Sequence, residues 1–275
     1  MTSTTTKTKT MRAPRTEARS TKPRAFLLAA VALGGLFFTR DASAIELGTP
    51  AQTHPFRSAQ HFALEIRVSP YYPAVDDEPG LSGTPFKDRF GDKPRIAMGL
   101  EFDWQMFRIP YVGTIGPGLG ASIVSMSRPA VTVTGKESGD EYGLSIYPMY
   151  LSAVLRADTF WRGLGFPLVP YAKLGLAVGF WRATNALGTS KATLPGETQA
   201  VPGKGMTFGT HMAGGVAFAL DAIDSGASRN MDNYLGINNT YVYAEYYWLN
   251  LNGLGQDNAL YVGTNTWAAG LAFEF

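Results

Sequence analysis

The sequence predicts an all-β fold: an eight-stranded antiparallel up-and-down transmembrane β-barrel, with a short periplasmic helix between strands six and seven. Two observations predict it. Large apolar residues alternate with small or polar ones, with a period of two, over eight segments that are mostly longer than the ~5–6 residues of a typical soluble strand. No stretch after Ala44 approaches the ~18 consecutive apolar residues that would indicate a membrane-spanning helix. Eight is also an even number, as single-chain bacterial barrels require.

The first 44 residues have the three parts of a secretory signal peptide. Residues 1–24 are basic, Ala25–Phe38 is a run of 14 apolar residues, and Ala42-Ser43-Ala44 has the small residues of a cleavage site. The alternative is a membrane anchor, but at ~1.5 Å per residue the run spans about 21 Å of a ~30 Å hydrocarbon core. We therefore expect 1–44 to be a cleaved signal peptide, with Met1 or Met11 as the start.

Composition and charge restrict the function of the remaining chain. Residues 1–44 carry eight Lys/Arg and two Asp/Glu, a net +6, so removing them from a chain of +2 leaves −4. The basic character thus belongs to the targeting segment, and no nucleic-acid partner is expected. There are no cysteines, which excludes disulfides, thiol nucleophiles and a lipid-anchored N-terminal cysteine. We expect residues 45–60 to form an N-terminal periplasmic segment and residues 61–275 to form the barrel.

The strands are expected in order at about 62–69, 95–106, 113–126, 147–158, 171–180, 208–220, 241–248 and 261–275. The second has the most regular alternation, and the third is rich in glycine. Pro117 lies inside the third, so we expect a bulge or a late start there. In a soluble barrel of the lipocalin kind, the large residues would point inward. In a transmembrane barrel they face lipid, and the small and polar ones face the lumen.

The connections alternate between long and short, as they do in outer-membrane barrels. Long outer loops are expected at 73–94, 127–142 and 185–205, a modest one at 250–258, and short turns near 108–111 and 159–167. The exception is 221–239, where apolar residues fall near helical spacing and Gly236 provides a stop. We predict a short amphipathic helix there, at the membrane interface, with an irregular loop as the alternative.

Charged residues on the inward faces are predicted to form a lumenal network that closes the barrel. We expect Arg156 and Lys173 to pair with Glu245, Glu101 or Glu65, because isolated buried charge is costly. An ion path is the alternative, but both signs are interleaved, unlike the single-sign rings of selective pores. The expected members are Glu65, Arg67, Glu101, Asp103, Arg156, Asp158, Lys173, Glu245 and Glu274.

No catalytic, cofactor-binding or metal-ligating constellation is found in the sequence, so no enzyme is predicted. None of His54, His61 and His211 has a spaced serine partner, and His211 is expected to lie hydrogen-bonded in the lumen. The acidic residues of the first long loop, 76–78 with Asp88 and Asp92, could bind Ca²⁺ or bridge to lipopolysaccharide, but we interpret the loop as solvated.

Aromatic residues are expected in two belts at the membrane surfaces. The outer belt would contain Tyr71, Tyr72, Phe180, Trp181, Tyr246, Trp248 and Tyr261, and the inner belt Phe62, Phe160, Trp161, Phe218 and Phe275.

The chain ends in Leu-Ala-Phe-Glu-Phe, in which Phe273 and Phe275 resemble the C-terminal signal that the outer-membrane assembly machinery reads in its clients. The mature chain resembles small eight-stranded outer-membrane barrels of the type that includes OmpA, OmpX and OmpW. More narrowly, it is similar to a poorly characterised deltaproteobacterial outer-membrane barrel family in three segments: residues 169–175, residues 220–241, and Ala244-Glu245-Tyr246.

This resemblance implies a monomer in the cell outer membrane, with outer-membrane lipid, lipopolysaccharide and the assembly machinery as partners. The predicted role is structural or surface-interacting, with specificity in the exposed loops. The alternatives are a narrow channel for small hydrophobic molecules and a lipid-modifying enzyme.

Overall fold

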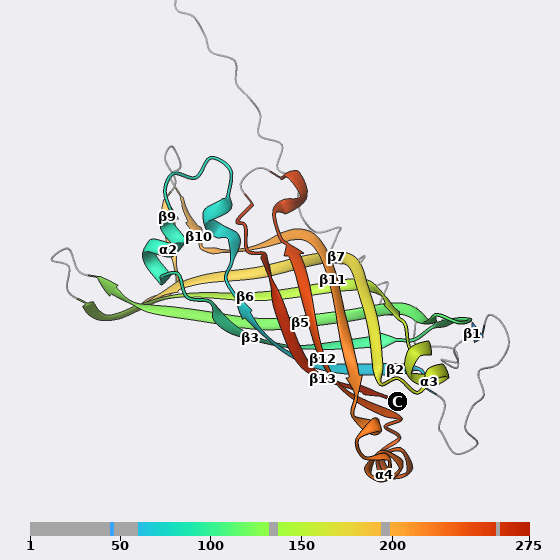
Figure 1. Ribbon diagram of the computed structural model, residues 1–275. Coiled ribbons are helices and arrows are strands. Elements are labelled where there is room, and N and C mark those ends of the chain that lie inside the picture. Colours follow the sequence, from blue (N-terminus) through green and yellow to red (C-terminus); the bar gives the residue numbers. More distant parts are fainter. Residues whose placement is uncertain (1–44, 47–59, 132–136, 194–198, 257–258) are drawn as a thin grey trace, which may run out of the picture. The chain divides into compact units, whose positions relative to one another are not determined.

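A computed structural model describes residues 45–46, 60–131, 137–193, 199–256 and 259–275 (Figure 1). These residues belong to a single compact unit, Ala42–Phe275. The predicted signal peptide at 1–44 and most of the predicted segment at 45–60 lie outside the described residues. Among the residues described, no helix is long and apolar enough to cross a membrane.

Eight antiparallel strands form a closed barrel in which each strand pairs with the next along the chain, and the last pairs with the first. The predicted fold and the expected number of strands are confirmed. The strands are β2 (Phe62–Tyr71), β3 (Arg95–Trp104), β5 (Gly113–Val131), β6 (Glu137–Arg156), β7 (Leu168–Asn185), β11 (Lys204–Ala219), β12 (Asn239–Asn250) and β13 (Thr264–Glu274).

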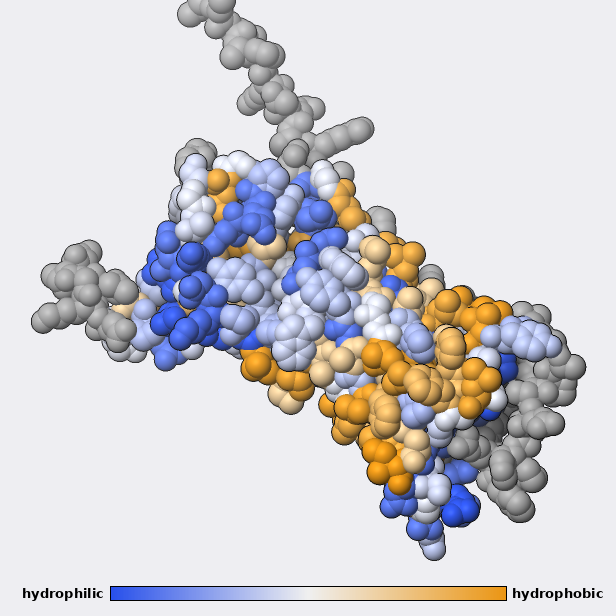
Figure 2. Space-filling model, viewed as in Figure 1, coloured by the Kyte–Doolittle hydropathy of each residue, from blue (hydrophilic) through white to orange (hydrophobic). Residues whose placement is uncertain are grey.

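The burial of side chains follows the predicted alternation, with apolar residues outward and charged residues inward. In β3, Ile96 is 64% exposed and Glu101 only 1%. In β12, every second residue is buried from Asn239 onward, and Val242, Tyr246 and Trp248 are exposed. Figure 2 shows apolar residues gathered over part of the barrel wall and hydrophilic ones at the end that carries α2 (Pro85–Phe90). The interior of this barrel is therefore the polar side.

The third connection differs from the expected loop at 127–142. β5 continues to Val131 and β6 begins at Glu137, with pairs such as Ser127↔Gly143 and Arg128↔Tyr142. The glycine, proline and charged residues of this segment predicted a loop. Instead, the two strands pair with each other here, and this pairing satisfies the backbone N–H and C=O groups. At 19 and 20 residues, both strands exceed the ~9–11 residues that a bilayer requires.

The irregularity expected at Pro117 lies in the facing strand. β5 is continuous, and Pro117 pairs with Ala153. On its other side, β5 pairs first with β4 (Phe107–Ile109) and then with β3, and the register shifts by one residue between Ile115↔Phe107 and Gly118↔Asp103. The extra residue therefore lies between β3 and β4, as in a β-bulge.

The helix predicted between strands six and seven is present at the end of the barrel where the C-terminus lies (Figure 1). The 3-10 turn η2 (Leu220–Ala222) precedes α4 (Ser225–Leu235). The Asp224 side chain accepts from the amides of Gly226 and Ala227, and Gly236, at φ 70°, ends the helix. Gly236 acts as the predicted stop because glycine adopts this left-handed conformation without steric cost.

Short elements complete the connections at both ends of the barrel. At the end with the C-terminus, β1 (Ile45–Glu46) pairs in parallel with β4, and α3 (Thr159–Leu164) joins β6 to β7. At the other end are η1 (Ala74–Asp77), α2, β8 (Gly188–Thr189), the hairpin of β9 (Lys191–Thr193) and β10 (Ala200–Pro202), and η3 (Gly253–Gly255).

Candidate functional site

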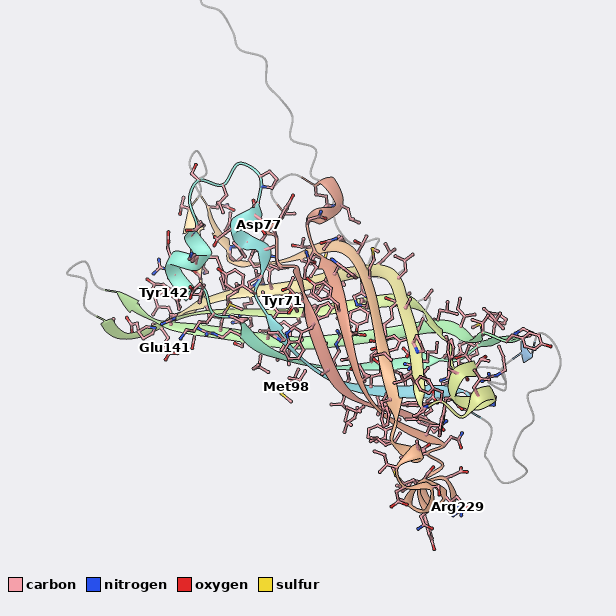
Figure 3. All side chains as sticks on the ribbon, in the orientation of Figure 1. Tyr71, Asp77, Met98, Glu141, Tyr142 and Arg229 are labelled. Carbon is pink, nitrogen blue, oxygen red and sulfur yellow. The ribbon has the colours of Figure 1, made fainter. Side chains whose placement is uncertain are left out.

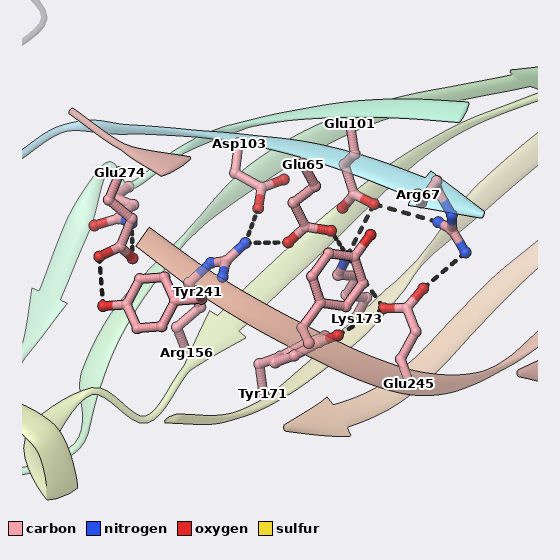
Figure 4. Close-up of polar contacts among 12 residues, drawn as sticks. Glu65, Arg67, Glu101, Asp103, Arg156, Tyr171, Lys173, Tyr241, Glu245 and Glu274 are labelled. Atoms are coloured by element: carbon pink, nitrogen blue, oxygen red, sulfur yellow. Dashed lines mark hydrogen bonds and ion pairs between the residues drawn. The ribbon is translucent and has the colours of Figure 1, made fainter. Parts of the chain in front are cut away.

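Seven charged side chains meet in the middle of the lumen, and none is more than 4% exposed (Figure 4). We call them the ion cluster. It contains four carboxylates and three cations: Glu65 and Arg67 of β2, Glu101 and Asp103 of β3, Arg156 of β6, Lys173 of β7 and Glu245 of β12.

Lys173 lies between carboxylates from three strands. Its Nζ is 2.7 Å from Glu65 Oε2, 2.8 Å from Glu101 Oε2 and 3.3 Å from Glu245 Oε2. Glu65 and Glu101 are direct cross-strand neighbours, and like charges in that position repel. The ammonium therefore neutralises a repulsion that the pairing of β2 with β3 creates.

The two arginines extend the cluster in opposite directions. Arg156 pairs with Glu65 and, at 2.5 Å, with Asp103 Oδ2. Arg67 Nη2 lies 2.7 Å from Glu245 Oε1, and Arg67 Nη1 lies 3.5 Å from Glu101 Oε2. As expected, Arg156 contacts Glu65, and Lys173 contacts Glu65, Glu101 and Glu245. Together the three cations join five of the eight strands.

Three tyrosines contact the ion cluster, and none of them was among the predicted site residues. Tyr150 accepts from Arg67 and donates to Glu101 Oε2 at 2.6 Å, and Tyr171 donates to Glu245 Oε2 at 3.1 Å. The Arg67 guanidinium also lies 4.8 Å from the ring centre of Tyr247. These tyrosines occupy the same alternate, inward-facing strand positions as the charged residues. This alternation was the signal in the sequence that could have identified them.

Two predicted members lie outside the cluster, nearer the end with the C-terminus. Arg108 binds both oxygens of Asp158, at 3.1 and 2.9 Å, and Arg162 Nε lies 2.9 Å away. Glu274 instead accepts from neutral donors, Gln105 at 2.8 Å, Tyr241 at 2.8 Å and Asn239 at 3.1 Å. Their expected membership is corrected by these contacts: among the described residues, neither Asp158 nor Glu274 forms an ion pair with Arg67, Arg156 or Lys173.

His211 lies in the lumen, as expected, but it has a serine partner that the sequence did not reveal. Its Nδ1 is 2.8 Å from Ser152 Oγ, and its ring stacks on Tyr150 with centroids 3.8 Å apart. Among the described residues, His211 Nε2 has no hydrogen-bond partner. The pair thus lacks the orienting third group of a nucleophilic triad, and both side chains are buried.

Above the ion cluster, toward the long loops, the lumen is apolar, which contradicts the expected small or polar interior. The side chains that fill it come from most strands and from the loops, and they include Val124, Met126, Leu144, Ile146, Leu249, Leu251 and Val262. Tyr71, labelled in Figure 3 and expected in the outer aromatic belt, is one of this group. It is buried, and its hydroxyl donates to the carbonyl of Val262. We call this group the apolar plug.

The first long loop covers the apolar plug. Phe86 of α2 is buried against it, with its ring 5.2 Å from those of Tyr72 and Phe90. Asp76, expected in a solvated acidic loop, caps α2 instead, since its two oxygens accept from the amides of Phe86 and Lys87 at 2.7 and 2.9 Å.

The long β5–β6 hairpin fastens this loop from outside. Arg89 lies 4.4 Å from the ring centre of Tyr142, and Arg128 Nε donates to the carbonyl of Phe90 at 3.2 Å.

The chain ends on the first strand of the barrel. The amide of Phe275 donates to the carbonyl of Phe62, and the amide of Phe62 donates back to the carbonyl of Phe275, at 2.9 and 2.8 Å. The Phe275 ring packs against Phe62 and Phe102 on the outer face, with centroids 6.1 and 6.4 Å away. Phe273 is half-buried on the same face.

A closed barrel with apolar side chains outside and paired charges inside is the architecture of a transmembrane β-barrel. No family model matches the chain, and no curated protein matches it. Neisserial surface protein A is a solved structure with a similar fold, with 12% sequence identity and a TM-score of 0.41 over 79% of this chain and 98% of that one. The attachment invasion locus protein Ail of Yersinia pestis has 14% identity and a TM-score of 0.36, covering 78% of this chain and 97% of its own. The N-terminal β-barrel domain of Pseudomonas aeruginosa OprF has 13% identity and a TM-score of 0.35, covering 78% of this chain and 99% of its own.

Proposed function

We propose that the protein resides in the outer membrane as a monomeric, non-enzymatic barrel with a structural or surface-interacting role. The observation that carries this proposal is where the two kinds of side chain lie: apolar residues are exposed on the outer face of the barrel, and the charged residues of the ion cluster are buried inside it. The closed sheet also has no free edge among its eight strands, which removes the usual route to strand-mediated association. Phe273 and Phe275, at the seam between β13 and β2, fit a signal read by the assembly machinery.

The orientation can be tested by labelling, because the chain has no cysteine. Leu187, at the end with the long loops, is 96% exposed, and Tyr234, at the end with α4, is 85% exposed. A membrane-impermeant maleimide applied to intact cells should label L187C and leave Y234C unlabelled until the cells are lysed. Equal labelling of both variants, or recovery of the protein without detergent, would contradict residence in the outer membrane.

We further propose that the lumen is closed to ions. The ion cluster and the apolar plug obstruct it at two successive levels, and an eight-stranded barrel is only wide enough for side chains to fill. The purified protein in planar bilayers should therefore show little or no conductance. R67S/R156S, which shortens two long side chains of the ion cluster, provides the matched comparison once heat-modifiable gel mobility shows that it folds. A large, steady open conductance of the wild type would rule out the closed lumen.

A second candidate is a conduit for small hydrophobic molecules, and the apolar plug favours it. A ligand would enter under the first long loop and leave sideways, since the ion cluster lies beneath. Cells with the protein would then accumulate a fluorescent hydrophobic probe, N-phenyl-1-naphthylamine, faster than cells without it, and replacing residues 74–92 by a short glycine–serine linker would accelerate uptake further. Equal uptake in all three strains would exclude this function.

An enzymatic function has less support. The nearest approach to a nucleophile and base is Ser152 with His211, which is buried below the apolar plug and lacks an orienting group among the described residues.

A further inference from the structure

Four polar side chains form a row across four neighbouring strands on the outer face of the barrel. Lys204 of β11 pairs with Arg182 of β7, Arg182 with Ser145 of β6, and Ser145 with Ser125 of β5. The two serine hydroxyls are 3.0 Å apart. With strands ~4.8 Å apart, the row extends over about 14 Å. We call it the basic row.

The basic row lies at the upper boundary of the apolar wall. The neighbouring row on the same outward face, two residues away on each strand, contains Met206, Phe180 and Tyr147. These three residues are exposed, and Phe180 pairs with both of the others. The outer face thus changes within one step from apolar to cationic, at the end of the barrel that carries the long loops. This is the level at which lipid headgroups would meet the wall.

The pairing of Lys204 with Arg182 is unfavourable by itself, because like charges directly opposite each other in a sheet repel. Among the residues that the structure describes, neither side chain has an ion pair. The nearest acidic residue on β6, Glu141, lies four residues beyond Ser145 and pairs across to Pro129. An anion bound between the two cations would remove the repulsion.

The donors of the basic row suit a phosphate group. Arg182 Nε donates to Thr189 Oγ1 at 2.9 Å, which orients the guanidinium and leaves its terminal nitrogens available for two parallel bonds to one anion. Lys204 adds a second charge, and Ser145 and Ser125 add hydroxyl donors. Arginine recognises phosphate through this bidentate geometry, and lysine does so as a point charge.

We propose that the basic row binds a phosphate of an outer-leaflet lipid headgroup of the lipid A class. The proposal rests on the proposed residence in the outer membrane. The acyl chains of such a lipid would lie on Met206, Phe180 and Tyr147, directly below the phosphate. The site therefore places cationic side chains beside an apolar surface, which matches the anionic headgroup and the acyl chains of such a lipid.

The test uses the full mature chain reconstituted in phosphatidylcholine vesicles with increasing amounts of lipid A. The readout is thermal unfolding followed by heat-modifiable gel mobility. R182Q/K204Q removes both charges, and K87Q/K93Q removes two exposed charges of the first long loop and serves as the matched control. We expect lipid A to raise the unfolding temperature of the wild type and of the control. The double variant should need about tenfold more lipid A for the same rise, since charge-assisted contacts are lost.

Two further arms separate the possible failures. Inorganic phosphate without lipid A should give no rise, and a rise with phosphate alone would identify a site for free anions and overturn the lipid assignment. An equal response of R182Q/K204Q and the wild type would overturn the basic row as the site. A protein that fails to insert into phosphatidylcholine vesicles would contradict the proposed membrane residence instead, so the two proposals fail distinguishably.

Discussion

Lys173 Nζ lies 2.7 Å from Glu65 Oε2 at the centre of the barrel. The two residues are 108 positions apart in the chain and come from strands that are not neighbours in the sheet. Their contact crosses the lumen, so it couples opposite parts of the wall in addition to the hydrogen bonds within the sheet.

Lys173→Met should destabilise the barrel strongly. It removes the cation that contacts three carboxylates and leaves the four buried carboxylates of the ion cluster facing only two arginines, a loss of about 3–5 kcal/mol for comparable buried pairs. Urea unfolding in phospholipid vesicles, followed by gel mobility, measures it. The exposed Lys93→Met provides the control and should change the free energy of unfolding by less than about 0.5 kcal/mol. A similar small effect for Lys173→Met would show that the ion cluster does not stabilise the fold.

The carboxylates of the ion cluster should differ in their contributions. Glu65 contacts two cations, Arg156 and Lys173, whereas Asp103 contacts only Arg156, and its Oδ1 has no partner among the described residues. With four carboxylates facing three cations, Asp103→Asn removes the excess negative charge. We expect Glu65→Gln to cost about 3 kcal/mol and Asp103→Asn about 1 kcal/mol or less, in the same urea assay. The reverse order would refute this assignment of the contacts.

Asp76→Ala should loosen the first long loop without unfolding the barrel. The mutation removes the side chain that caps α2, and a lost cap costs about 1 kcal/mol. Hydrogen exchange at the amides of Phe86 and Lys87 should accelerate about fivefold, the equivalent of that energy. Asp77→Ala changes the neighbouring exposed carboxylate and should leave both amides protected. Equal acceleration in the two variants would indicate a general effect of loop charge.

Tyr72 provides a pH-dependent reporter of the same loop. Burial raises the pKa of Tyr72 above its ordinary value of 10.0, and the nearby Asp76, Asp92 and Asp77 raise it further. Since the folded loop favours the neutral phenol, this contribution to stability is complete below pH 10 and is lost as the pH rises through the raised pKa. Ultraviolet difference titration of the wild type against Tyr72→Phe measures that pKa, and Asp76→Ala should bring it closer to 10. No change in Asp76→Ala would contradict the electrostatic cause.

Gly116→Ala should destabilise the barrel at the bulge between β3 and β4. A Cβ at Gly116 would lie 1.8 Å from the carbonyl oxygen of Trp104, whereas one at Gly139 would have no atom of the described residues within 4 Å. We expect a loss of about 1–3 kcal/mol for Gly116→Ala, as for other overpacked sites. Gly139→Ala should be nearly neutral in the same unfolding measurement. A neutral Gly116→Ala would show that the bulge can open at little cost.

Much of the ion cluster could be predicted from sequence, because a period of two fixes which residues face inward. Arg156, Lys173 and their glutamate partners share that parity. The alternation does not show how far along the barrel axis a residue lies, because the stagger of each strand depends on pairing registers that the sequence leaves open. For this reason the sequence predicts Asp158 and Glu274 as members although neither forms an ion pair with the three cations of the ion cluster, and it does not reveal the pairing of Ser152 with His211.

The apolar plug shows another limit of the sequence pattern. Val124, Met126 and Ile146 face inward, while the adjacent Ser125 and Ser145 face outward, so the alternation persists there with the apolar residues inside. The first long loop makes an apolar interior favourable at that level, because Phe86 of α2 is buried against these side chains. Contacts between segments distant in sequence determine such burial.

The sequence by itself determined the eight strands, the direction of their faces and the helix before β12, because these follow from local periodicity and from glycine at a helix end. The tertiary structure alone decided which of the candidate carboxylates each cation contacts, the length of the β5–β6 hairpin and the apolar filling of the lumen above the ion cluster. These depend on strand register and loop packing, in which residues far apart in the chain become neighbours only after the barrel has closed.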